Sequence, residues 1–309
     1  MPTRPLLIGT RGSPLAFWQA RLVWTRLLQA NGLGEGDVGL SAITTSGDRI
    51  KDKPLREFGG KGLFTKEIDE ALLRGDVAMA VHSMKDLETD LPPGLCIAAI
   101  LPRGDVRDAF ISTKAPSLAE LPPGSTVGTS SLRRQAQLMR LRPDLRIVNF
   151  RGNVETRLKK LAEGQADATL LALAGLERLG LASHATSILS TEEMLPAVAQ
   201  GAIGVTCRSG DAGTRALLAP LNDAAASTTV TCERSFLSRL DGSCKTPIAG
   251  LAEIEQGMLR FRGMVLTPDG SESYQVELTG AAENAPSLGA DAGEELLARA
   301  GPDFMAKLA

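Results

Sequence analysis

One pattern occurs twice in the chain and constrains its fold more than any other feature. Residues 7–15 are typical of a short buried strand, a Gly-Thr-Arg-Gly-Ser break and a helix that starts at Pro14, and residues 125–132 repeat the order strand, Gly-Thr-Ser, helix. Residues 163–171 likewise echo the turn and strand of residues 74–80. Open α/β sheets place helix N-termini and ligand sites beyond their strand ends. We therefore predict two α/β lobes around a shared cleft.

The last third of the chain has a different pattern. A helix is expected at residues 224–240, antiparallel strands at residues 251–255, 258–265 and 274–279, and a last helix at residues 293–300. The expected fold class is α/β, with two doubly wound lobes that resemble those of periplasmic binding proteins and a third, small α+β domain. The predicted domains are lobe 1 at residues 1–101 plus 202–220, an anion-binding lobe 2 at residues 105–197, and a C-terminal domain at residues 223–309.

Local signals predict the elements of the first lobe. Ser13 is expected to cap a helix over residues 14–29 whose buried face carries Leu15, Trp18 and Leu22.

Further along, residues 46–62 are rich in Gly and Lys and are expected to form a mobile loop, for which one candidate role is that of a lid. A helix over residues 64–73 is expected to end at Gly75, before a buried strand at residues 76–80.

Composition excludes several classes of partner. The formal net charge is −2, so no overall field attracts nucleic acid or an anionic membrane, and no apolar run is long enough to span a bilayer. The four cysteines show no close pairing, and the two histidines have no metal-ligand spacing. We expect a reduced cytoplasmic protein without a metal site, and a monomer because no apolar surface helix is evident.

Positive charge is nevertheless concentrated in one segment. Between Thr129 and Lys160, nine Lys and Arg residues accompany only two acidic residues. The run from Thr129 to Arg134 offers hydroxyls, backbone N–H groups and two guanidiniums at an expected helix start, and Arg151 and Arg157 follow the next expected strand. Each cation alone is more often a solvated surface residue. Together they predict a pocket for a small polyanion.

A cation and a carboxylate stand side by side in Val-His-Ser-Met-Lys-Asp, residues 81–86, directly after the expected strand. Lys85 could bind an anion there and Asp86 a donor or a developing cation. The alternative is a solvated ion pair that closes the strand.

Two further segments carry reactive or cationic groups. Gly59-Gly60-Lys61-Gly62 lacks the spacing of a nucleotide-binding phosphate loop but fits a cationic lid. Cys244 lies in a Gly-Ser-Cys-Lys-Thr-Pro turn, where exposure and the adjacent Lys245 favour a thiolate. It is a candidate for covalent chemistry, whereas Cys96, Cys207 and Cys232 lie in apolar or helical contexts and are expected to be buried.

These motifs occur together, and in this order, in one known family. The chain resembles porphobilinogen deaminase (hydroxymethylbilane synthase) in segments spread over nearly its whole length: residues 8–16, 59–64, 81–86, 128–134, 151–153, 196–201 and 242–247.

The resemblance implies an enzyme of tetrapyrrole biosynthesis that condenses four porphobilinogen units head to tail, releases ammonia and yields linear hydroxymethylbilane. It implies a dipyrromethane cofactor joined by a thioether to Cys244, and Asp86 as the catalytic residue that stabilises the pyrrole N–H and the cation formed when ammonia leaves. Lys61 and Phe64 match the lid loop. The acetate and propionate groups of cofactor and substrate would be bound by Arg11, Ser13, Gln19, Lys85, Thr129, Ser130, Ser131, Arg133, Arg134, Arg151, Arg157, Ala172 and Gln200.

One position departs from the family pattern, because Ser243 precedes the cysteine where many relatives have Gly. A second hypothesis is a two-lobed carboxylate-binding sensor or transport protein without catalysis. Such a protein would also need Arg at helix starts, but it would need neither Cys244 nor Asp86.

Overall fold

The computed structural model describes residues 5–49, 62, 64–240 and 246–307. The chain forms two compact units, each described by itself below. Unit 1 comprises Met1–Asp52, Gly59–Gly104 and Ala202–Ser227, and unit 2 comprises Lys53–Phe58, Asp105–Gly201 and Thr228–Ala309. Lobe 2 and the C-terminal domain thus share one unit, and the three predicted domain boundaries stay a prediction.

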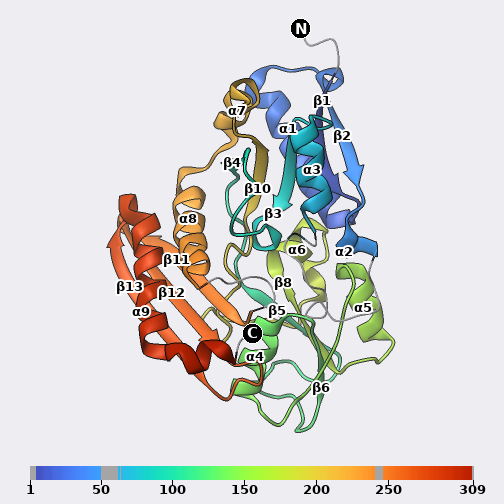
Figure 1. Ribbon diagram of the computed structural model, residues 1–309. Coiled ribbons are helices and arrows are strands. Elements are labelled where there is room, and N and C mark those ends of the chain that lie inside the picture. The colour runs from blue at the N-terminus through green and yellow to red at the C-terminus, as the bar shows by residue number, and fades with distance from the viewer. Residues whose placement is uncertain (1–4, 50–61, 63, 241–245, 308–309) are drawn as a thin grey trace. The chain divides into compact units, whose positions relative to one another are not determined.

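Unit 1 is built on a five-stranded sheet with the order β2-β1-β3-β10-β4 (Figure 1). Strands β1, β2 and β3 are parallel, while β10 runs antiparallel to both of its neighbours. The chain therefore enters this sheet again after residue 200 to complete it. The strands are β1 (Leu6–Arg11), β2 (Val38–Ile43), β3 (Met79–Ser83), β4 (Leu95–Ile100) and β10 (Ile203–Arg208).

Helices cover both faces of this sheet. Alternate residues of each strand point to opposite sides, and apolar side chains occur on both. Ile8 and Met79 join the cluster that packs against helix α1 (Pro14–Asn31), whereas Leu7 and Ala80 join the cluster beneath helix α3 (Lys66–Arg74). The other helical elements in the described residues of unit 1 are α2 (Ser46–Arg49), α7 (Ala212–Leu218) and 3₁₀ turns at Glu35–Asp37, Met84–Asp86 and Ala219–Leu221.

The start of α1 was predicted correctly, and its buried face was predicted in part. Ser13 caps α1, as expected, and a left-handed Gly32 ends it at Asn31. The fully buried apolar residues are Ala20, Val23 and Leu27. Of the predicted residues, Leu22 packs against the same cluster and Leu15 is partly buried, whereas Trp18 is 38% exposed.

Two other local predictions need correction. Strand β3 continues to Ser83 instead of ending at Ala80, because His82 and Ser83 still pair with β10, which the local pattern could not reveal. The expected loop at residues 46–62 begins with a helical turn, α2, and most of its remainder lies outside the described residues.

Unit 2 contains a second five-stranded sheet whose order, β7-β6-β8-β5-β9, repeats the layout of unit 1. Strands β7, β6 and β8 are parallel, and β5 is antiparallel to both of its neighbours, β8 and β9. The repeated sequence pattern therefore corresponds to a repeated topology. The strands are β5 (Asp108–Ser112), β6 (Thr126–Gly128), β7 (Arg146–Val148), β8 (Ala168–Ala172) and β9 (Ser187–Ile188).

This sheet is also covered on both faces. Leu138 of helix α4 (Leu132–Leu141) packs with Phe110 and Leu170, and Leu161 of helix α5 (Val154–Ala162) packs with Ile111 on the other side. Helix α6 (Leu173–Arg178) joins α5, and a 3₁₀ turn follows at Ala182–His184.

The rest of unit 2 is the α+β portion expected at the C-terminus. Strands β11 (Ile248–Glu255), β12 (Met258–Leu266) and β13 (Ser273–Ala281) form an antiparallel sheet in chain order (Figure 1). Phe236 of helix α8 (Ala224–Arg239) packs on Phe261 with ring centroids 4.8 Å apart. Helix α9 (Ala285–Ala306) follows a 3₁₀ turn at Ala282–Asn284 and begins eight residues before its predicted start.

The predicted fold class is therefore confirmed: two doubly wound α/β lobes and a small α+β domain. Across the residues that the structure describes, no helix is both long and apolar enough to cross a membrane.

Candidate functional site

In unit 1, the predicted site residues gather at one edge of the sheet. Strands β1 and β3 are parallel neighbours, so their carboxyl ends meet at the same edge. Arg11 ends β1, and the turn with Lys85 and Asp86 follows β3. Ser13 lies at the start of α1, where its hydroxyl accepts a hydrogen bond of 3.3 Å from the Ala16 N–H. This edge combines two cations, a carboxylate and a helix N-terminus.

Gln19 is tied to the end of β3. Its side chain is 1% exposed, and its Nε2 donates to Ser83 Oγ over 3.0 Å. The Ser83 hydroxyl stands 3.2 Å from Gln19 Oε1. Gln19 thus belongs to this group, and it positions the residue two places before Lys85.

Arg11 is held by a carboxylate that the sequence did not point to. Its guanidinium lies 2.5 Å from Asp48 Oδ1, and its Cζ stands 4.3 Å from the centre of the Phe64 ring. Burial alone would raise the pKa of Asp48, but hydrogen bonds from Arg11 and Thr45 outweigh burial and lower this pKa below its ordinary value. Arg11 is therefore oriented by Asp48 on one side and by Phe64 on the other.

Asp86 differs from Asp48, which is bound by Arg11. It is exposed at the end of the 3₁₀ turn, beside a half-buried Lys85. Its carboxylate makes no hydrogen bond or ion pair with the part of the chain that the structure describes. A carboxylate that is not engaged by the protein is available for a donor or a cation of a ligand.

In unit 2, strands β6, β7 and β8 are parallel, so their carboxyl ends also share one edge. The loop after β6 is ordered by its own hydroxyls. Thr129 Oγ1 accepts a hydrogen bond of 3.1 Å from the Ser131 N–H, Ser130 Oγ donates to Asn149 Oδ1 over 2.6 Å, and Ser131 caps α4. These bonds fix the loop that the sequence predicted as an anion site.

Arg133 and Arg134, which the sequence predicted as ligands of an anion, are both engaged by a carboxylate of the protein itself. Both are buried, at 4% and 5% exposure, and both bind the fully buried carboxylate of Asp108 in β5. Burial would raise the pKa of Asp108, but the charges of the two guanidiniums outweigh it and hold this pKa well below its usual range. The pair and the carboxylate form one buried cluster.

Gln200 and Ala172 belong to the same cluster. Gln200 Nε2 donates to Asp108 Oδ1 over 2.9 Å and to the Val106 carbonyl over 2.7 Å. Ala172 is the residue opposite Asp108 in the β5–β8 ladder. Residues predicted from three distant segments thus converge on Asp108.

The loop that carries Gln200 is held by a second buried carboxylate. Ala199, before Gln200, has a left-handed φ of 59°. Its N–H donates to Glu233 Oε2 over 2.5 Å, while Glu233 Oε1 accepts 2.8 Å from Ala252 N–H. Glu233 on α8 therefore links this loop to β11.

The other predicted cations follow β7. Arg157 Nε donates to the Gly152 carbonyl over 2.9 Å. Lys160 Nζ donates to the Arg151 carbonyl over 3.1 Å and lies 5.9 Å from the centre of the Phe150 ring. Arg151 lies between β7 and α5, and Arg157 lies within α5, in the positions that the sequence predicted; both are half-buried.

Two predicted residues, Cys244 and Lys61, lie outside the described residues. Cys207 and Cys232 are buried, as expected, while Cys96 is half-buried with its sulfur 3.9 Å from that of Cys207. Burial raises the pKa of both Cys207 and Cys232 to about 12, so neither thiol is suited to nucleophilic chemistry. Within the described ranges, no group of His, Cys, Asp and Glu is arranged to hold a metal ion.

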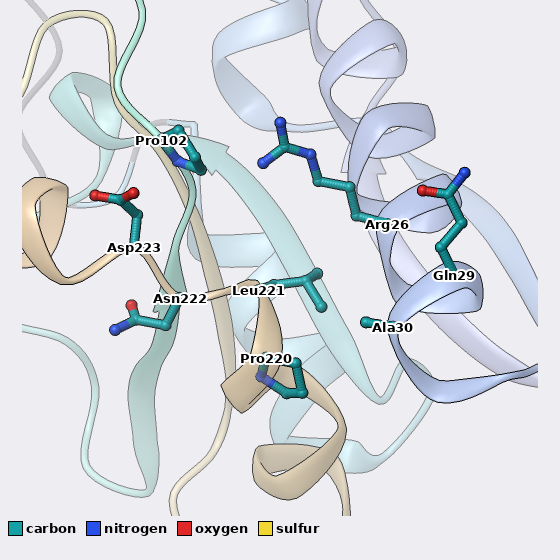
Figure 2. A pocket seen from close by; sticks show the side chains of 8 residues that line it. All are labelled: Arg26, Gln29, Ala30, Pro102, Pro220, Leu221, Asn222 and Asp223. Atoms are coloured by element: carbon teal, nitrogen blue, oxygen red, sulfur yellow. The ribbon is translucent and has the colours of Figure 1, made fainter.

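Unit 1 also contains an open pocket of about 460 Å³ that no sequence motif indicated (Figure 2). Its amide and carboxylate groups serve the fold, because Asn222 Oδ1 accepts a hydrogen bond from Ile100 N–H and Asp223 Oδ1 accepts one from Ala226 N–H. The pocket is lined by Arg26, Gln29, Ala30, Pro102, Pro220, Leu221, Asn222 and Asp223, none of them a predicted site residue.

Comparisons with known proteins match nearly the whole chain. Residues 6–216 match the family described as "Porphobilinogen deaminase, dipyromethane cofactor binding domain", and residues 227–298 match "Porphobilinogen deaminase, C-terminal domain". A porphobilinogen deaminase of Paracoccus denitrificans is 54% identical over 303 residues, which cover 98% of this chain and 97% of that protein.

A chloroplastic porphobilinogen deaminase of Oryza sativa subsp. japonica is 55% identical, over 97% of this chain and 86% of that protein. Among solved structures, the methionine binding protein MetQ is similar with a TM-score of 0.45 and 15% identity, over 71% of this chain and 89% of that one. From the family matches and the identities to these relatives, the chain belongs to the porphobilinogen deaminase family.

Proposed function

We propose that this protein is a transferase of tetrapyrrole biosynthesis that condenses four porphobilinogen units head to tail, with release of ammonia, to give linear hydroxymethylbilane. The observation that carries the proposal is family membership at 54% identity over 98% of the chain. The non-catalytic sensor is not favoured, because the matched relatives are named as deaminases.

The residues present fit a cofactor that bears carboxylates. Arg133 is buried, and its Nε has no hydrogen-bond partner in the described parts of the chain. A buried N–H group without a partner is costly, and an anionic ligand would satisfy it. We propose that Arg133 and Arg134, with the Thr129–Ser131 loop, hold carboxylates of the dipyrromethane and of bound porphobilinogen, and that Cys244 forms the thioether to the dipyrromethane.

The charge of the substrate accounts for the cations. Each porphobilinogen has an acetate and a propionate group, so every addition brings two more negative charges. Arg11, Lys85, Arg151 and Arg157 are proposed to bind these groups, since Arg forks and helix N-termini suit carboxylates. When bound, the dipyrromethane supplies the pyrrole carbon to which the first unit is joined.

Asp86 is proposed as the catalytic residue. Loss of ammonia from porphobilinogen leaves a cationic pyrrole. An exposed carboxylate with no partner among the described residues can accept a hydrogen bond from the pyrrole N–H and stabilise its charge. Lys61 and Phe64 are proposed to belong to a lid, with Phe64 already stacked on Arg11.

Intact mass tests the cofactor assignment. Protein from cells that make porphobilinogen should be heavier than its sequence by one dipyrromethane, and Cys244→Ser should remove the excess while Cys96→Ser retains it. An unmodified wild-type mass would contradict the proposal, as would an excess that persists in Cys244→Ser.

Turnover tests the role of Asp86. Asp86→Asn should keep the wild-type melting temperature, because the exposed carboxylate makes no described contact, but should lose at least about 10²-fold in kcat. Asp90→Asn, another exposed position nearby, serves as control. Near-normal turnover of Asp86→Asn would remove Asp86 from the mechanism.

We further propose a cytoplasmic monomer with the three domains predicted above. The proposal of a cytoplasmic location is based on the biosynthetic role, which family membership supports. Light scattering coupled to size-exclusion chromatography measures the oligomeric state, and a mass of twice 32.5 kDa would contradict the monomer.

A further inference from the structure

We infer that Asp108 is a positioning residue that sets the geometry and the net charge of the anion-binding cluster in unit 2. The inference rests on the proposed function for the identity of the anion, a pyrrole carboxylate. It concerns a residue that no motif in the sequence singled out, since Asp108 lies well before the cationic segment.

The hydrogen bonds of Asp108 account for both of its oxygens. Oδ1 accepts from Arg134 Nη2 over 2.8 Å and from Gln200 Nε2 over 2.9 Å. Oδ2 accepts from Arg133 Nη2 over 2.6 Å and from Arg134 Nε over 3.2 Å. A carboxylate has about four acceptor positions. All of them are therefore occupied by hydrogen bonds from Arg133, Arg134 and Gln200, the three side chains that are proposed to line the site.

Each guanidinium is also held by a backbone carbonyl. Arg133 Nη1 donates to the Leu195 carbonyl over 2.8 Å, and Arg134 Nη1 donates to the Leu170 carbonyl over 2.9 Å. With Asp108 on one side and a carbonyl on the other, neither fork can turn. What remains for a ligand is a fixed part of each fork, including Arg133 Nε, which has no hydrogen-bond partner among the residues that the structure describes.

The charge of the cluster is incomplete without an anion. Among the described residues of the cluster, two buried guanidiniums face one buried carboxylate, which leaves one excess positive charge. Buried charge without compensation is unfavourable. A bound carboxylate would neutralise the excess, whereas without Asp108 the cluster would carry two uncompensated cations and would lose its fixed geometry.

The backbone of Asp108 is itself rigid. Asp108 begins β5, which lies between β8 and β9, and its carbonyl accepts a hydrogen bond of 2.9 Å from Leu189 N–H. A ligand-binding group is most accurately placed when its support sits on a strand inside a sheet.

Asn is the informative replacement because it has the shape of Asp without the charge. Its NH₂ group would face guanidinium donors, so at least two hydrogen bonds would be lost. In the full-length protein, we expect Asp108→Asn to raise the KM for porphobilinogen roughly tenfold or more. We also expect a smaller fraction of chains to carry the dipyrromethane mass, measured on the intact protein. Asp108→Glu, which keeps the charge, should recover part of both losses.

Asp105→Asn is the matched control. Asp105 also binds an Arg through both oxygens, Arg107 at 2.6 Å, but that pair is partly exposed and separate from the cluster. Its KM and cofactor fraction should equal those of wild type.

Folded Asp108→Asn with wild-type KM and wild-type cofactor fraction would overturn the inference, and a lower melting temperature alone would not rescue it. If Asp108→Asn does not fold, Asp108→Glu decides, because its displaced oxygens should still raise KM and a wild-type KM would refute the inference. Wild-type protein that has neither turnover nor added mass would refute the proposed function, which is a separate result.

Discussion

At the scale of single residues, carboxylates of the protein, one partly exposed and one buried, hold its cations in place. Arg11 is oriented by Asp48, and Arg133 and Arg134 by Asp108. The Arg11–Asp48 pair is balanced in charge, whereas Asp108 faces two guanidiniums, and in both places the carboxylate fixes the orientation of the cation that it binds. Fixed donors bind a carboxylate ligand with less loss of side-chain entropy than mobile ones.

The pair of Arg11 and Asp48 predicts an acid-sensitive contribution to stability. The pKa of Asp48 is lowered in the folded state, so its contribution is present above the ordinary Asp value, near pH 4, and is lost as pH falls through the lowered pKa. Asp48→Asn should lower the free energy of unfolding at pH 7 by about 1 kcal/mol or less, because the pair is partly exposed to solvent.

Chemical denaturation at several pH values measures this effect. The difference between Asp48→Asn and wild type should shrink below pH 4. Asp76→Asn, which disrupts a more exposed pair with Arg74, should change stability less at every pH. A deficit of Asp48→Asn that grows on acidification would contradict the assignment.

At the scale of elements, helix α3 has a carboxyl with the opposite pH behaviour. Asp69 is 5% exposed, and burial, helped by the nearby charge of Glu88, raises its pKa to about 6. Its folded pKa exceeds the unfolded one, so ionisation destabilises the protein as pH rises through 6. Asp69→Asn should therefore raise the free energy of unfolding by roughly 2 kcal/mol at pH 8.

This gain should vanish below pH 4, where Asp69 is protonated in both states. Glu70→Gln on the exposed side of α3 is the control, since its contact with Arg74 is long and solvated. An Asp69→Asn variant that is less stable than wild type at pH 8 would show that the ionised carboxylate is instead stabilising.

Elements also show where prediction from sequence succeeds and where it stops. The Ser13 cap and the glycines that end α1 and α3 were predictable, because a cap depends on residues within one turn. The extension of β3 to Ser83 was not, since it depends on pairing with β10, over 100 residues later.

The same limit applies to the site. Strand-end logic and the family motifs located Arg11, Lys85, Asp86 and the cationic loops. They missed Asp48, Asp108 and Glu233, because a lone acidic residue in a strand or helix carries no local sign of the partner it will meet. The burial of Arg133 and Arg134 was not predicted for the same reason, because it depends on their pairing with Asp108.

At the scale of the whole molecule, the C-terminal sheet is joined to the lobe that carries the arginine pair. The turn between β12 and β13 places Gly270 against helix α4: a Cβ there would stand 2.4 Å from the Ala136 carbonyl oxygen and 2.7 Å from Arg140 N. Gln135 Nε2 also donates to the Pro268 carbonyl over 3.2 Å. The helix that presents Arg133 and Arg134 is thus supported by the C-terminal domain.

Gly270→Ala should therefore lower the free energy of unfolding by about 2 kcal/mol or more, because its Cβ meets backbone atoms that cannot move aside cheaply. Gly257→Ala is a matched control with a similar left-handed φ, 82° against 71°, but with open space around its Cβ. It should cost only about 1 kcal/mol. Equal losses in the two variants, measured by urea denaturation, would show that the turn does not press on α4.

The contact at Gly270 also bears on how relatives of this chain can diverge. Because it is made by backbone on both sides, drift in the side chains of α4 leaves it intact, and no compensating substitution there can make room for a side chain at residue 270. Selection should therefore hold this glycine in lineages whose turn packs on the helix in the same way, while its neighbours in the turn change freely. In a lineage that has lost this glycine, we expect the turn to lie farther from helix α4.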